Sequence, residues 1–100
     1  MLLLLWEYRV RPERTEEFEA LYRPDGPWGD LFRNAPGFVS VTLLKDFNDK
    51  TRFLVADRWT SESAYESFRR SHGAEYADLS ARGRRLYERE TEVGRFDFLE

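Results

Sequence analysis

Residues 53–72, FLVADRWTSESAYESFRRSH, contain the pattern that decides the fold. The first part alternates in steps of two, which predicts a strand that ends at Trp59. Ser61 is a favourable N-cap, so we expect a helix to begin directly after the strand. The only histidine of the chain, His72, lies about one helix length further on. A strand followed at once by a capped helix indicates a mixed α+β domain.

Elsewhere in the chain, strand-like segments with apolar residues in steps of two again alternate with helix-like segments. Pro12 is suited to a first helical position, and the breaker-rich segment 23–27 ends the helix that it begins. A second helix is expected to carry an apolar seam from Tyr65 to Leu86, with a kink or interruption at residues 71–73. A short extra helix is expected at about residues 27–34. The predicted strands are residues 2–11, 38–47, 52–59 and 92–99.

The resulting β-α-β-β-α-β order predicts a ferredoxin-like split β-α-β fold in one domain, residues 1–100. Its sheet would have four antiparallel strands, with helices on one face only. The other face would carry Val39, Val41 and Leu43, or their alternates. An apolar face left in water is a sign of association, so we predict a homodimer that packs sheet to sheet.

Composition excludes several classes of function. The chain has no cysteine, which removes thiolate nucleophiles and Cys-ligated metal sites. The formal net charge of −3 gives no general attraction to nucleic acid. The apolar start is followed at once by Glu7 and Arg9, unlike a signal peptide, and no stretch is long enough to span a membrane. We therefore expect a cytoplasmic protein with no metal and no cofactor.

His72 and Asp57 are the main polar candidates for chemistry. A histidine on an apolar helix seam is most often a packed, hydrogen-bonded residue. Histidine is also the side chain best suited to acid–base work at neutral pH. Asp57 shares a strand face with Trp59 and would be costly to bury without a partner. An arginine could neutralise it in a purely structural pair, and the candidates are Arg9, Arg52 and Arg58.

Four short segments resemble the antibiotic biosynthesis monooxygenase family of dimeric α/β barrels. They are Val10-Arg11-Pro12-Glu13, Asp57-x-Trp59, Ser61-x-x-Ala64-Tyr65-x-x-Phe68 and Ser71-His72. The segment RPDGPWGDLF, residues 23–32, is not typical of the smallest members and suggests a subgroup.

The resemblance implies a sheet-to-sheet dimer with a pocket between sheet and helices in each subunit. Some members oxygenate polyketide-type aromatics without metal or flavin: the substrate loses a proton and its carbanion passes an electron to O₂. Related members degrade haem, and others have no known activity. The pocket asparagine that the resemblance implies for oxygenating and haem-degrading members has no counterpart here, because Asn34 and Asn48 fall in predicted turns.

The resulting hypothesis is a cofactor-independent monooxygenase acting on a small aromatic or quinol-type metabolite. An alternative is a non-catalytic dimeric module that binds a small apolar ligand, and a third is haem binding through His72. The expected catalytic residues are His72, as the base, with Trp59 and Asp57. The expected substrate-binding residues are Trp6, Tyr8, Arg9, Trp28, Tyr65 and Phe68.

Overall fold

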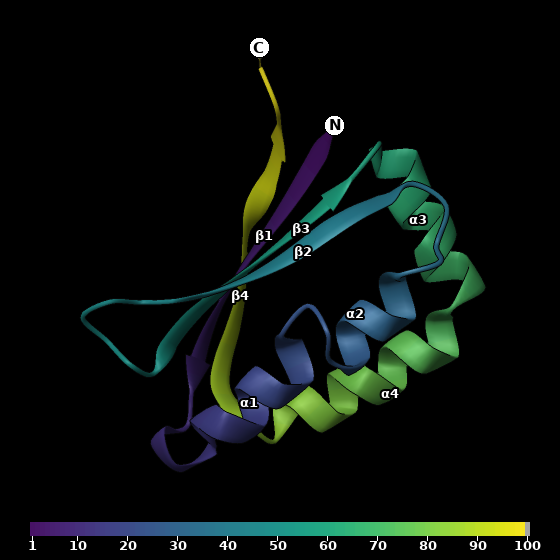
Figure 1. The fold of residues 1–100 in the computed structure, drawn as a ribbon. Coiled ribbons are helices and arrows are strands. Elements are labelled where there is room, and N and C mark those ends of the chain that lie inside the picture. The colour runs from purple at the N-terminus through teal and green to yellow at the C-terminus, as the bar shows by residue number, and fades with distance from the viewer. Residues whose placement is uncertain (100) are drawn as a thin grey trace.

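The computed structural model describes residues 1–99, and its helices cover one face of a single twisted sheet (Figure 1). This arrangement confirms the predicted α+β, ferredoxin-like fold. Within residues 1–99, no helix is both long enough and apolar enough to cross a bilayer. The elements are β1 (Leu2–Val10), a 3₁₀ turn (Pro12–Arg14), α1 (Thr15–Tyr22), α2 (Pro27–Phe32), β2 (Phe38–Lys45), β3 (Arg52–Trp59), α3 (Glu62–Ser71), α4 (Gly73–Arg84) and β4 (Tyr87–Asp97).

The sheet is antiparallel with the strand order β2-β3-β1-β4. The two central strands are therefore β3 and β1, which pair Asp57 with Leu4 and Val55 with Trp6. This register places Asp57 in the middle of the sheet, on a strand that has neighbours on both sides. Any polar group on the helix side of that strand is removed from water.

The interruption of the second helix agrees with the sequence-based prediction, whereas the start of the last strand does not. The predicted seam helix is divided at His72 into α3 and α4, as the interruption at residues 71–73 indicated. The last strand begins at Tyr87, so its predicted start at residue 92 is wrong. Its early part pairs with β1, where Glu90 stands opposite Tyr8. The pairing partner, and not the local hydrophobicity, determines where this strand begins.

The core lies between the helices and one face of the sheet. Burial alternates along β3, and each second residue from Phe53 to Trp59 is buried. α1 contributes Phe18 and Tyr22 to the same layer. Gly83 on α4 lets Tyr22 pack closely, since a Cβ at this position would overlap the Tyr22 hydroxyl.

The opposite face of the sheet has no helix over it (Figure 1). Leu3 and Leu5 of β1 alternate with the buried residues of that strand, and so do Leu54 and Ala56 of β3. All four are partly exposed. The open face is therefore apolar at its centre, and we call these four residues the open-face patch.

Candidate functional site

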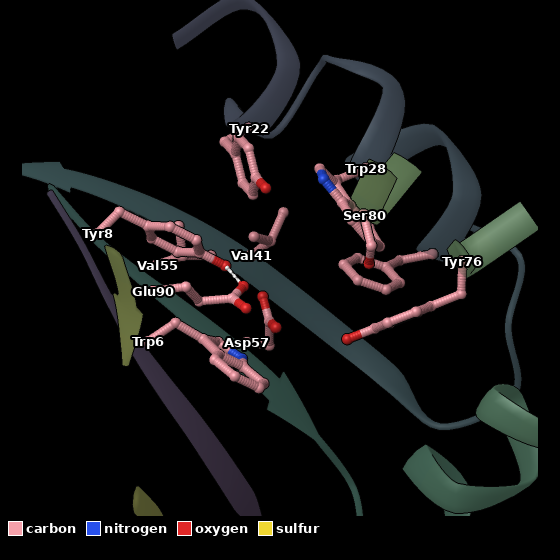
Figure 2. A pocket seen from close by; sticks show the side chains of 11 residues that line it. Trp6, Tyr8, Tyr22, Trp28, Val41, Val55, Asp57, Tyr76, Ser80 and Glu90 are labelled. Atoms are coloured by element: carbon pink, nitrogen blue, oxygen red, sulfur yellow. Dashed lines mark hydrogen bonds between the residues drawn. The ribbon is translucent and has the colours of Figure 1, made fainter. Parts of the chain in front are cut away.

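A cavity lies between the sheet and the helical layer, and Figure 2 shows side chains from both layers directed into it. Its volume is about 30 Å³, which is room for roughly two water molecules. Glu90 borders the cavity and is exposed, so the cavity reaches the surface beside β4. The lining residues are Trp6, Tyr8, Tyr22, Trp28, Phe32, Val41, Val55, Asp57, Tyr76, Ser80 and Glu90.

Asp57 forms the floor of this cavity and is 6% exposed. Its Oδ1 atom has no hydrogen-bond partner among residues 1–99. Burial raises the pKa of Asp57 from 3.8 to about 7, and the Trp6 indole N–H beside it offsets a smaller part. At neutral pH both the protonated and the ionised forms of the carboxyl are therefore populated.

Tyr8 and Glu90 form the side of the cavity that faces β4. The Tyr8 hydroxyl donates a hydrogen bond of 2.7 Å to Glu90 Oε2, which is drawn as a dashed line in Figure 2. Burial and the nearby Tyr22 raise the pKa of Tyr8 well above its usual value. Tyr8 therefore remains protonated at neutral pH and acts as the donor to Glu90.

The helical side of the cavity is aromatic. Trp28 on α2 lies edge-on to Tyr76 of α4, with ring centroids 5.0 Å apart, and its ring lies 6.0 Å from that of Tyr22. Burial raises the pKa of both tyrosines, so they stay uncharged. The indole Nε1 of Trp28 is buried and has no hydrogen-bond partner among residues 1–99. The wall thus offers flat apolar faces and one unused N–H donor.

The two charged residues that line the cavity, Asp57 and Glu90, are both acids. The lining contains no arginine, lysine or histidine, although the chain has 16 Lys and Arg residues. Across residues 1–99, no three His, Asp or Glu side chains gather as metal ligands would. The site is therefore suited to proton transfer and to holding an aromatic ring.

An aromatic ligand needs more space than the cavity has in this structure, since small-molecule pockets usually measure about 300–1,000 Å³. Trp6 and Tyr76 are the partly exposed aromatic residues of the lining, so they are its least enclosed aromatic side chains. Ligand entry at this site therefore requires side-chain movement at the rim.

The structure brings together four of the residues expected from sequence, which are Asp57, Trp6, Tyr8 and Trp28. Trp59 does not line the cavity. It is 0% exposed and packs edge-on against Phe32 and Tyr65, with ring centroids 5.7 and 5.6 Å apart. Tyr65, Phe68, His72 and Arg9 are also absent from the lining.

His72 lies where α3 meets α4. Its ring stacks on Phe68 at 5.1 Å, and its Nδ1 is buried without a partner among residues 1–99. Arg9 lies near the C-terminal end of β1 and forms an ion pair with Asp49. Neither side chain reaches the cavity that Asp57 lines.

Sequence reasoning missed several lining residues, of which Tyr22, Tyr76 and Glu90 matter most. Tyr22 and Tyr76 both fall on predicted apolar helix seams, so their positions were a usable signal. Glu90 was missed because the last strand was expected to begin two residues after it. Only the register with β1 brings its carboxylate to Tyr8.

Comparison with known proteins gives a consistent result. The sequence model described as antibiotic biosynthesis monooxygenase matches residues 1–79. A mutant of SnoaB, a cofactor-independent oxygenase from Streptomyces nogalater, superposes with a TM-score of 0.83 at 20% identity, covering 99% of this chain and 93% of SnoaB. PA3566 from Pseudomonas aeruginosa superposes with a TM-score of 0.73 at 18% identity, covering 99% and 94%. At such identities the structural likeness shows the fold. No curated protein matches the chain.

Proposed function

Because the chain belongs to the antibiotic biosynthesis monooxygenase family, we propose that it is a cofactor-independent monooxygenase acting on a small aromatic, quinol-type metabolite. The observation that supports this most strongly is Asp57, a buried carboxyl in an aromatic cavity. A general base works best when its pKa lies near the working pH, and burial brings the pKa of Asp57 to about 7. The proposal assigns the base to Asp57 and not to His72, because Asp57 lines the cavity.

The reaction is balanced without a cofactor. Ionised Asp57 removes a proton from an activated ring methylene, and the carbanion passes one electron to O₂. The carbon radical and superoxide then combine, and the proton returns from Asp57 to give a hydroperoxide. Loss of water leaves a carbonyl, so one oxygen atom enters the substrate and the other leaves as water. The aromatic walls hold the ring and keep bulk water from the anion.

Trp59 and Tyr65 take a supporting place in this proposal. Both are almost fully buried, and Phe32 lies between Trp59 and the cavity. Trp59 packs against the cavity-lining Phe32 and against Phe68, and Tyr65 packs against Trp59. Their substitution would alter the shape of the cavity through these rings.

Oxygen uptake tests the proposed reaction. With a panel of anthrones and quinols, we expect protein-dependent O₂ consumption that matches carbonyl product one to one. The rate should survive chelators, because none of the proposed steps uses a metal. An electrode trace that stays at the uncatalysed rate for every substrate would reject the monooxygenase.

A binding module without catalysis is the second candidate. The observation that favours it is the lining itself, which contains no asparagine where oxygenating relatives are expected to have one. Native mass spectrometry of protein purified from its source would then show a retained small molecule. Such a ligand, bound with no oxygen uptake, would replace the first proposal.

We also propose that the protein is a homodimer that buries the open-face patch. A monomer would leave Leu3, Leu5 and Leu54 at a sheet face that no helix covers. Light scattering should give twice the 12.0 kDa chain mass at micromolar concentration. Leu54→Glu should give a monomer, whereas Ala81→Glu, on the exposed surface of α4, should stay dimeric. A wild-type monomer would contradict the proposal.

A further inference from the structure

Two buried polar atoms of opposite kind face the same cavity without partners among residues 1–99. One is the acceptor Oδ1 of Asp57 on the sheet floor, and the other is the donor Nε1 of Trp28 on the helical side. Figure 2 shows the two side chains entering the cavity from opposite layers. Buried polar groups in folded proteins are nearly always paired, so two such atoms in one cavity call for a specific explanation.

Neither atom makes a hydrogen bond among residues 1–99, although the Trp6 indole lies beside the Asp57 carboxyl. The Trp28 indole N–H lies close enough to the Tyr22 hydroxyl to lower the pKa of Tyr22 slightly, but the pair does not reach hydrogen-bond geometry. The hydroxyl of Tyr8 is already engaged with Glu90. The 6% exposure of Asp57 and the 7% exposure of Trp28 show that both residues are largely shielded from bulk solvent, although the cavity beside them has room for about two water molecules. A molecule inside the cavity is therefore the partner that both atoms can share.

We propose that Trp28 and Asp57 read the ligand at two points, and that the ligand is an uncharged phenolic ring carrying a second oxygen. The ring hydroxyl donates to Asp57, and the second oxygen accepts from Trp28. The aromatic faces of Tyr22 and Tyr76 hold the ring between these points. This inference refines the proposed function, because it names the recognition groups of the same site.

The negative charge of the lining also selects between ligands. The charged residues at the cavity are Asp57 on β3 and Glu90 on β4, and the lining described within residues 1–99 contains no cation. A ligand carboxylate would have to lose its hydration beside two acids. A site built from unpaired polar groups also discriminates strongly against ligands that leave one of them unsatisfied. The pocket therefore selects uncharged rings over anionic ones.

Four matched probes test this recognition by direct binding in the absence of turnover. 4-Hydroxyacetophenone has both the donor and the acceptor. 4-Ethylphenol lacks the carbonyl, 4-methoxyacetophenone lacks the donor, and 4-hydroxybenzoate carries a negative charge. Titrations followed by NMR at neutral pH should rank 4-hydroxyacetophenone about ten-fold above each of the other three, since each leaves a buried group unpaired or adds charge.

The variant Trp28→Phe keeps an aromatic ring and removes the N–H together with part of the ring volume, so the ranking of the probes, and not the absolute affinity, is the readout. It should bind 4-hydroxyacetophenone and 4-ethylphenol equally, while its preference over 4-methoxyacetophenone remains. If Trp28→Phe lowers the affinity for all four probes by the same factor, Trp28 has only a packing role and the proposal is overturned. It is also overturned by a wild-type protein that binds 4-ethylphenol or 4-hydroxybenzoate as tightly as 4-hydroxyacetophenone, or that binds none of the four.

The binding experiment and the oxygen experiment fail separately. If no substrate consumes O₂ but the probe ranking holds, the oxygenase is rejected and the two-point recognition stands. If O₂ is consumed but the ranking is absent, the recognition by Trp28 and Asp57 is rejected and the oxygenase stands. Because the wild-type ranking needs no variant, a folding defect in Trp28→Phe cannot hide either result.

Discussion

Replacing Asp57 by Asn is expected to lower kcat for oxygen consumption by about 10²–10⁴-fold, which is the range that a positioned general base contributes. Asparagine keeps the shape of the side chain and one oxygen but cannot take a proton. In the wild type, kcat/KM should rise with pH up to about 7 and then level off, following ionisation of Asp57. The residual rate of Asp57→Asn should lack this rise.

The groups that face Asp57 bear on whether the rise of kcat/KM towards pH 7 can be assigned to this residue. β1 contributes Trp6 and Tyr8, α1 and α4 contribute Tyr22 and Tyr76, and β4 contributes Glu90. Burial raises the pKa of all three tyrosines above their ordinary value, so they do not titrate near pH 7.

The comparison variant for this experiment is His72→Phe, since Phe can keep the stacking on Phe68. If Asp57 is the base, His72→Phe retains the rise near pH 7. A profile that loses its rise in His72→Phe and keeps it in Asp57→Asn would identify His72 as the base instead.

The same substitution, Asp57→Asn, is expected to stabilise the folded protein at alkaline pH. The pKa of Asp57 is about 7 in the fold and about 3.8 when the chain is unfolded. Between these values the folded state binds the extra proton, so the free energy of unfolding falls as pH rises and the loss is complete above pH 7. The full difference corresponds to about 4 kcal/mol, at about 1.4 kcal/mol per pH unit.

Urea unfolding at pH 4 and pH 8, at one fixed protein concentration, measures this effect. Asp57→Asn should equal the wild type at pH 4 to within about 1 kcal/mol and exceed it by about 2–4 kcal/mol at pH 8. Asp25→Asn is the matched control, because Asp25 is an exposed carboxylate paired with Arg23 and should change stability by at most about 1 kcal/mol. If the difference in free energy of unfolding between Asp57→Asn and the wild type is the same at pH 8 as at pH 4, the unpaired burial of Asp57 is refuted.

The fold was predictable because its strongest signals are local. Buried and partly exposed residues alternate along the whole of β3, which ends at Trp59. Ser61 then caps α3, since its hydroxyl oxygen accepts a hydrogen bond of 3.0 Å from the Ala64 amide. The start of β4 was not predictable, because the strand begins on charged residues that lie at an exposed sheet edge. There the backbone pairing with β1 decides the structure, and the side chains carry no matching pattern.

The candidate site was predictable only in part, for a similar reason. The alternation of β3 places Asp57 and Trp59 on one face, which is observed. It cannot tell which of the two reaches a cavity. That depends on tertiary packing, since Phe32 and Phe38 both lie edge-on to Trp59, at 5.7 and 5.4 Å, and cover it. Those rings come from a different part of the chain, beyond the reach of local periodicity.

Trp28 and Asp57 lie on different kinds of element, which has a consequence for how the protein can evolve. The base candidate Asp57 lies on a central strand, where change disturbs the whole sheet, whereas Trp28 lies on α2, between α1 and β2. New variants of residues 23–36 can therefore alter which molecules are accepted while the chemistry below them stays constant. Substrate range and reactivity are held on separately mutable segments, so diversification of this lineage is expected to concentrate in that connection.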